Sequence, residues 1–176
     1  LFERSAGNGL ILIVYNRFEV DTSYERAIFF CKGVIETVKK LGWAPDIVHC
    51  NDWITSLIPM YLKTTYKNDP IFQSAKCVFT VYDNEFNHKF DQSMIEKVKM
   101  IDIEDSMLAN LKSADYEGLI KLGAEYSDAV IRAGEEVSES LNKLFALLEK
   151  GKKVDTIEKD DNLLDSYYNL YNELVD

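Results

Sequence analysis

Short apolar runs that alternate with amphipathic segments are the feature that most restricts the fold of this chain. Runs rich in β-branched and aromatic residues predict buried strands at residues 10–15, 47–50, 76–82 and 128–132. The longest segment between them, residues 24–41, carries apolar side chains at the spacing of one helix face. Strands that alternate with helices form βα units, which favour a mainly parallel sheet. We therefore expect an α/β fold, a Rossmann-like three-layer domain.

The ends of helix 24–41 carry recognisable start and stop signals. Thr22 and Glu25 have the spacing of a capping box, in which each side chain bonds the other residue's backbone N–H. Gly42 is placed to end the helix, and Pro45 prevents it from continuing into strand 47–50.

Further helices and one break are predicted for the rest of the chain. Helices are expected at residues 53–66, twice within 91–112, and at 116–126, 138–150 and 163–175. We divide the chain into a domain at 1–150, a charged linker at 151–160 and a C-terminal helix at 161–176. Leucines and tyrosines at helical spacing predict that this last helix packs back onto the domain. An amphipathic tail that pairs with another molecule is the alternative.

Charge and cysteine usage narrow the class of protein. The formal charge of −10 argues against a nucleic-acid groove or an anionic membrane surface, which both require Lys and Arg, and leaves neutral ligands such as sugars open. No apolar run approaches the length of a membrane-spanning helix. The three cysteines, odd in number and in apolar contexts, indicate reduced core residues of a cytoplasmic protein.

Side chains able to bind a ligand follow two of the predicted strands. Ligands of open α/β sheets bind beyond the carboxyl ends of the strands, and an aromatic face beside hydroxyl-binding groups suits a carbohydrate. The candidate substrate-binding residues are Asp52, Trp53, Asn51, His49, Tyr82 and Asp83.

Three of these residues also have a purely structural interpretation. Asp52 can cap the next helix, His49 can be a core histidine and Trp53 can be packing. No metal site is expected, because His49 and Cys50 lack further ligands and the other histidine, His88, lies in a polar loop. A Cys50–His49 nucleophile pair is excluded because adjacent strand residues point to opposite faces.

Several segments in one order resemble bacterial glycogen and starch synthases. They are residues 25–31, 41–53, 57–63, 78–81 and 122–130, of which the Gly42-Trp-Ala-Pro-Asp-Ile-Val-His-Cys-Asn-Asp-Trp53 string is the most specific. The resemblance implies half of a GT-B glycosyltransferase, the N-terminal, acceptor-side domain of two that face across a cleft. It further implies glucosyl transfer from ADP-glucose to an α-1,4-glucan, without a metal or other cofactor.

The departures from that family pattern concern the implied site. Asn51 replaces a second histidine, and Tyr82 and Asp83 stand where the family has His-Asn, whose histidine reaches the transferred sugar. The family's Lys-x-Gly-Gly donor loop and its second Rossmann domain are not found in the sequence. No catalytic residue is therefore assigned, and we expect no transfer by this chain alone.

Two hypotheses about function follow. The first is an ADP-glucose-dependent glucosyltransferase whose donor domain is supplied by another chain. The second is a pseudoenzyme, a non-catalytic remnant in glycogen metabolism that binds α-glucan or maltooligosaccharide weakly, or binds a protein partner. In either case nucleic acid and membrane are not expected partners.

Overall fold

One mixed sheet organises the structure, a computed structural model that describes residues 2–4, 10–14, 24–86, 89–134, 137–148, 153–157 and 163–176. Within these ranges the sheet has six strands in the order β1-β2-β3-β4-β5-β6. The strands are β1 (Phe2–Arg4), β2 (Leu10–Val14), β3 (Ile47–Asn51), β4 (Lys76–Val81), β5 (Ala129–Ala133) and β6 (Lys153–Ile157). Only β1 pairs antiparallel, with β2, and all other neighbours are parallel. The predicted α/β class with a mainly parallel sheet is confirmed.

The helices follow the predicted periodicity closely. They are α1 (Tyr24–Leu41), α2 (Leu57–Lys63), α3 (Ser93–Val98), α4 (Tyr116–Tyr126), α5 (Glu139–Leu148) and α6 (Leu163–Val175), with 3₁₀ helices at Trp53–Thr55 and Asp105–Ser113. The single helix expected at 53–66 is therefore a 3₁₀ turn followed by a short α-helix. Pro59 is the third residue of α2, where its missing N–H breaks no helical hydrogen bond.

The C-terminus of α1 ends as its sequence predicts. Gly42 takes a left-handed φ of +66°, and its N–H donates to the Lys39 carbonyl at 3.0 Å. The next N–H, of Trp43, reaches back to the Val38 carbonyl at 3.3 Å. This pair of bonds is a Schellman motif, which satisfies two of the helix's last carbonyls. The capping box expected at Thr22 lies outside the described residues.

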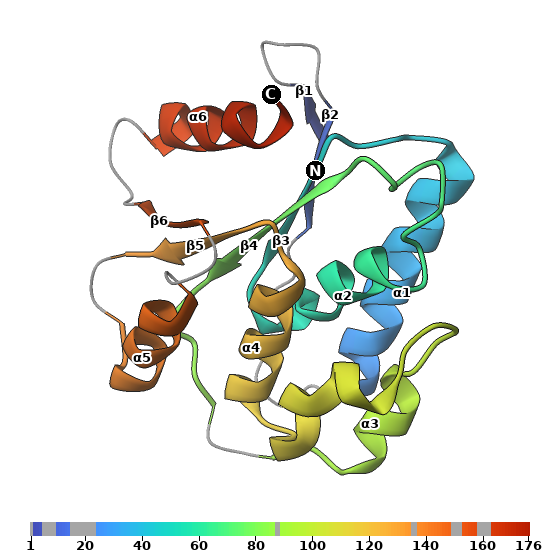
Figure 1. The fold of residues 1–176 in the computed structure, drawn as a ribbon, viewed down its shortest axis with the longest axis vertical. Helices are drawn as coiled ribbons and strands as arrows, with labels where there is room; N and C mark the ends of the chain where they lie inside the picture. Colours follow the sequence, from blue (N-terminus) through green and yellow to red (C-terminus); the bar gives the residue numbers. More distant parts are fainter. Residues whose placement is uncertain are drawn as a thin grey trace.

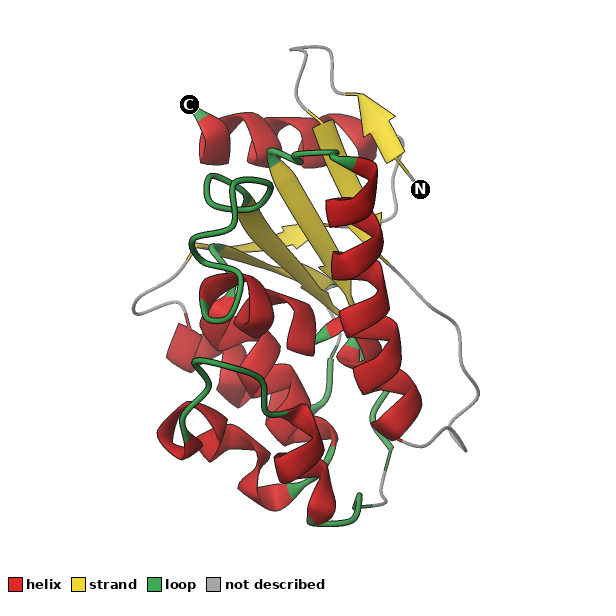
Figure 2. Ribbon diagram, turned by 90° about the vertical axis from the view of Figure 1, so that its right-hand side faces the viewer, coloured by secondary structure: helices red, strands yellow, loops and turns green. Residues whose placement is uncertain are grey.

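The order of the strands decides how the two faces of the sheet are covered. Each parallel strand lies beside the one before it in the chain, so right-handed crossovers place the connecting helices on the same face. Helices α1 to α5 gather on this face, and α6 lies alone on the other (Figures 1 and 2). Side chains alternate accordingly, since Val48 and Cys50 join the large core beneath α1–α5 while Ile47 contacts the smaller cluster beneath α6.

The charged run between α5 and α6 is not simply a linker. Residues Lys153–Ile157 form β6, which pairs in parallel with β5. An edge strand pairs on one side only and tolerates charged side chains, and this run also contains the strand formers Val154, Thr156 and Ile157. The proposed linker at 151–160 is corrected to a segment that contains an edge strand.

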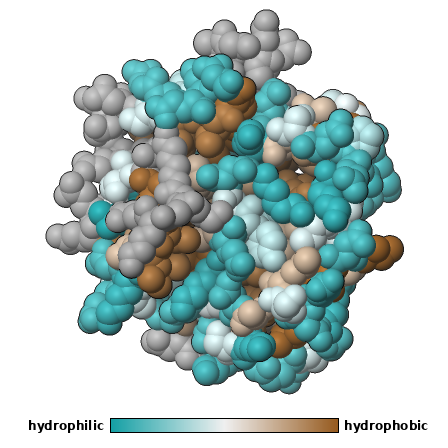
Figure 3. All heavy atoms as spheres, viewed as in Figure 1, coloured by the Kyte–Doolittle hydropathy of each residue, from teal (hydrophilic) through white to brown (hydrophobic). Residues whose placement is uncertain are grey.

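The surface and the cysteines agree with the composition. Hydrophilic side chains cover most of the face shown in Figure 3, with separate hydrophobic patches between them. Cys31, Cys50 and Cys77 are buried and are not joined in a disulfide within the described residues, and burial raises the pKa of Cys31 to about 12. None of the helices in the described ranges is long and apolar enough to cross a membrane.

Helix α6 packs on the sheet of its own chain, as its periodicity predicts. Leu170 and Tyr171 are buried in one cluster with Ile47, Val78 and Ile131 of the sheet. Leu164, on the same helix, is 64% exposed.

We expect Leu170→Ala to lower the free energy of unfolding by about 2–5 kcal/mol, because it leaves a cavity against the sheet. Leu164→Ala is the matched control, and we expect it to change stability by less than about 0.5 kcal/mol. Urea denaturation followed by circular dichroism measures both. Equal effects of the two substitutions would show that α6 does not dock through Leu170.

Candidate functional site

The carboxyl ends of β3 and β4 lie side by side and bring four of the predicted site residues to one edge of the sheet. The register pairs Asn51 with Thr80, so Asp52 and Tyr82 leave adjacent strands at this edge. The backbone N–H of Asp52 also donates to the Thr80 carbonyl at 2.9 Å, which extends the pairing by one residue. These two strands are therefore parallel neighbours.

Asn51 connects three strands at this edge. Its Nδ2 donates to the Val14 carbonyl at the end of β2, at 3.2 Å, and its Oδ1 accepts from the Tyr82 hydroxyl at 3.3 Å. Burial, with smaller contributions from Tyr167 and Asp52, raises the pKa of Tyr82 to about 12. Tyr82 is therefore an uncharged hydrogen-bonding group at neutral pH.

Asp52 has a strained backbone and a carboxylate that is already hydrogen-bonded. Its φ of 64° and ψ of 175° lie in a region that is essentially restricted to glycine. Oδ1 accepts from the N–H of Trp53 at 2.8 Å, and Oδ2 accepts from Nδ2 of Asn84 at 2.7 Å. Burial raises the pKa of Asp52, and these two hydrogen bonds partly offset the effect. The predicted capping role and a place at the candidate site are thus combined in one residue.

Asp83 joins the edge to the start of helix α5. Its Oδ2 accepts from the N–H of Ser138, immediately before α5, at 2.9 Å. A carboxylate at a helix N-terminus satisfies an otherwise free N–H and interacts favourably with the helix dipole. Asp83 is exposed, so a ligand at the edge can still reach it.

Trp53 does not form an open platform. Its side chain is 7% exposed and packs edge-to-face with Phe86, at a centroid distance of 5.1 Å, with Phe90 at 6.0 Å on a tilted plane. Phe86 also contacts Tyr116 of α4 edge-to-face. This cluster holds the backbone just after Asp52, so Trp53 supports the edge from below and cannot stack on a ligand.

His49 is a core residue held by hydrogen bonds at both ring nitrogens. Nδ1 lies 2.6 Å from the Tyr171 hydroxyl of α6, and Nε2 lies 2.6 Å from Oγ1 of Thr80. Burial lowers its pKa to about 3, so the ring is neutral at physiological pH. The side chain of His49 points to the α6 face of the sheet, and its predicted role in binding a ligand stays a prediction.

Comparison with known proteins gives this fold a family. A model of the starch synthase catalytic domain matches residues 5–150. The chain belongs to the starch synthase catalytic domain family. A glycogen synthase from Chlorobium limicola is 33% identical over 121 residues, which are 69% of this chain and 24% of that protein. One from Chlorobium phaeovibrioides is 30% identical over 147 residues, or 81% of this chain and 29% of that protein.

A solved structure shows the same fold. The catalytic domain of starch synthase IV from Arabidopsis thaliana, bound to ADP and acarbose, superposes with a TM-score of 0.59 at 18% identity. The match covers 80% of this chain and 30% of that one. The chain thus spans about a quarter of the length of the curated glycogen synthases named above.

Within this starch synthase domain, the sequence identified part of the edge and missed part of it. Asn51, Asp52, Tyr82 and Asp83 lie at the carboxyl ends of β3 and β4, while Trp53 is buried and His49 faces α6. Asn84 was missed, because nothing in a polar loop specifies which side chain turns back toward Asp52. Within the described ranges no group of His, Cys, Asp and Glu side chains is arranged to hold a metal ion, and His88 lies outside them.

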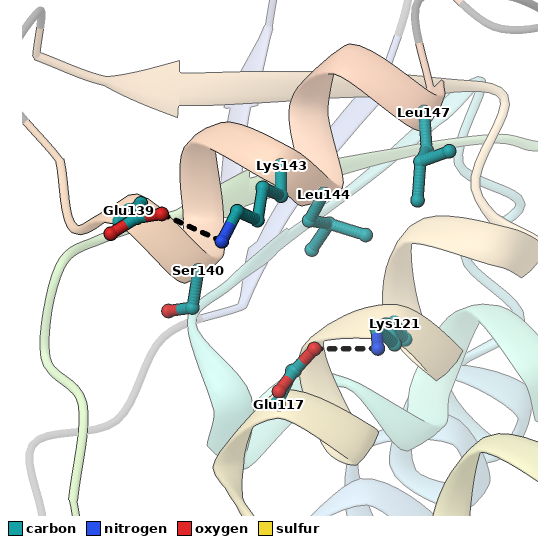
Figure 4. Close-up of a pocket in the computed structure, with 7 residues that line it drawn as sticks. All are labelled: Glu117, Lys121, Glu139, Ser140, Lys143, Leu144 and Leu147. Atoms are coloured by element: carbon teal, nitrogen blue, oxygen red, sulfur yellow. Dashed lines mark ion pairs between the residues drawn. The ribbon is translucent and has the colours of Figure 1, made fainter.

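Apart from this edge, a pocket of about 400 Å³ lies between α4 and α5 (Figure 4). Its charged side chains are paired within each helix, Lys121 with Glu117 and Lys143 with Glu139. Leu147, 63% exposed, lies at its rim in the close-up. These pairs leave no net charge in the pocket.

We expect His49 to make stability depend on pH. Its folded pKa of about 3 lies below the ordinary 6.5, so only the unfolded chain binds a proton there between these values. The contribution of neutral His49 to the free energy of unfolding is complete above about pH 6.5. Below that pH it decreases by about 1.4 kcal/mol per pH unit. The facing groups Tyr171, Tyr167 and Thr80 do not titrate in this range.

Urea denaturation of wild type and His49→Gln at pH 7, 6, 5 and 4 tests this. The difference in unfolding free energy between the two proteins should shrink as pH falls, because glutamine keeps a donor and an acceptor but binds no proton. A difference that stays constant with pH would contradict a buried neutral histidine.

We expect glycine to be better tolerated than alanine at position 52. Asp52→Ala keeps the unfavourable positive φ and loses the cap, whereas Asp52→Gly loses the cap alone. The glycine variant should therefore be more stable than the alanine variant by about 1–2 kcal/mol, measured by thermal unfolding. The opposite order would show that residue 52 does not hold a left-handed backbone.

Proposed function

We propose that this domain binds a neutral α-glucan at the carboxyl-end edge of its sheet and does not transfer glucose by itself. The observation that carries the proposal is the pairing of Asn84 with Asp52 across the ends of β3 and β4, in a chain of the starch synthase family. The two side chains offer an amide donor, an amide acceptor and carboxylate oxygens just beyond the ends of adjacent strands. Such a set binds vicinal hydroxyl groups of a sugar.

The charge around this edge supports a neutral ligand over a nucleotide sugar. Asp52 and the exposed Asp83 lie here, in a chain of formal charge −10, and pyrophosphate is repelled by carboxylates. Arg132, at the end of β5, donates to Asn142 at 3.2 Å and lies over the Phe145 ring at 5.7 Å. One nitrogen of its guanidinium is thus engaged with α5, while its buried Nε has no hydrogen bond among the described residues.

The groups that occupy the edge support a domain that does not transfer glucose by itself. Tyr82 stands where the family resemblance implies a histidine at the transferred sugar, and a phenol with a pKa of about 12 carries no positive charge at neutral pH. Holding donor and acceptor in register is worth about 7–11 kcal/mol of a reaction barrier. The described residues form one sheet and present one side of such an arrangement.

The test combines an activity assay with a binding assay on the same protein. With radiolabelled ADP-glucose and maltotriose, we expect no label in the glucan above a no-protein control. With ¹⁵N-labelled protein, maltotriose should shift the amides of residues 82–84 with millimolar affinity, because few contacts offset the cost of association. Asn84→Ala should weaken binding about two- to tenfold.

The matched control is Asn68→Ala, an exposed asparagine before β4, at the opposite end of the sheet. It should leave the affinity unchanged. Label transferred to maltotriose would establish a glucosyltransferase instead. Shifts confined to residues remote from the edge would show that the glucan site is elsewhere.

A further inference from the structure

A pocket of about 210 Å³ lies between α6 and the sheet, next to the edge described above. Strands β2 and β3 line it with Ile13, His49 and Asn51, and α6 lines it with Leu164, Tyr167, Tyr168 and Tyr171. Asn51 is shared with the carboxyl-end edge, where it binds Tyr82. Asn51 therefore belongs both to the pocket and to the edge of the proposed glucan site.

The wall beneath α6 is rigid because its polar groups bond one another. Tyr171 and Thr80 hold both nitrogens of His49 at 2.6 Å, and the Tyr167 ring stacks on Tyr171 at a centroid distance of 6.0 Å. The centroid of the Tyr167 ring also lies 5.5 Å from the centroid of the His49 ring. A wall fixed in this way presents the same aromatic faces with and without a ligand.

The lining also offers polar groups that are not used internally. The half-buried Tyr168 hydroxyl has no hydrogen bond to another described residue. The Asn51 amide makes one donor bond, to Val14, and keeps a second N–H. No formally charged side chain lines the pocket, because His49 is neutral. An uncharged ligand with hydroxyl groups fits this lining, and an ionic one does not.

Size limits that ligand to one ring. The volume corresponds to about seven water molecules at ~30 Å³ each, which suits a single six-membered sugar ring and is small for two. Tyrosine rings pack against the C–H face of a sugar, while their hydroxyls bond its rim. The aromatic surface absent at the buried Trp53 is thus present on α6.

We propose that this pocket binds one neutral pyranose ring, as the end unit of a glucan held at the adjacent edge. The identity of the ring rests on the proposed function, but the pocket is tested separately with a single-ring probe, methyl α-glucoside. Its binding is followed by ¹H–¹⁵N spectra of the whole chain. We expect shifts at residues 164–171 and at Asn51, with millimolar affinity.

Two variants locate the site on α6. Leu164→Trp fills the mouth of the pocket from a position that is 64% exposed, and should weaken methyl α-glucoside binding at least about tenfold. Leu147→Trp, the same change at a 63% exposed leucine on α5, should leave it unchanged. Tyr168→Phe removes only the free hydroxyl and should weaken binding about two- to tenfold.

The outcomes separate this inference from the proposed function. Loss of glucoside binding in Leu164→Trp, with wild-type melting temperature, supports the pocket even if maltotriose leaves residues 82–84 unshifted. Glucoside shifts that persist in Leu164→Trp, or no shifts at residues 164–171 at tens of millimolar, overturn it. In that case maltotriose shifts at residues 82–84 would still support the proposed function.

Discussion

The need to bury both faces of a parallel sheet is the constraint on which this structure depends. Strands β2 to β6 follow one another across the sheet, so the crossover helices cover one face and leave the other bare. Helix α6 covers that face with Leu170 and Tyr171 against Ile47, Val78 and Ile131. The Tyr171–His49–Thr80 hydrogen bonds fix the position of this helix on β3 and β4.

This packing also decides which residues are left to bind a ligand. Alternation along β3 directs His49 to the α6 face and Cys50 to the helical core, so the strand itself contributes no reactive group to the edge. The polar edge begins at Asn51, the last residue of β3, and at Asp52, whose N–H makes the last bond to β4. The same helix that removes His49 from the edge brings tyrosines beside Asn51 and so creates an aromatic pocket there.

Asp52 concentrates strain at the point where β3 turns into the 3₁₀ helix. A left-handed aspartate persists because its carbonyl accepts from the Thr55 N–H at 3.1 Å, its carboxylate caps Trp53, and the buried Trp53–Phe86–Phe90 cluster holds the following residues. Strain of about 1–3 kcal/mol is typical of binding and catalytic sites, where the surroundings force a side chain into one direction. Here it keeps the carboxylate turned toward Asn84.

The sequence alone determined the class of fold, most element boundaries and the family, because these depend on local periodicity, on turn residues such as Gly42 and on a contiguous motif. It also placed Asn51, Asp52, Tyr82 and Asp83 at one edge, since carboxyl ends of neighbouring parallel strands must meet. Only the tertiary structure decided that His49 bonds Tyr171, that Trp53 is buried, that Asn84 reaches Asp52 and that Lys153–Ile157 is a strand. Each of these depends on a partner distant in sequence, and local residue patterns do not specify which distant side chain fills a given face.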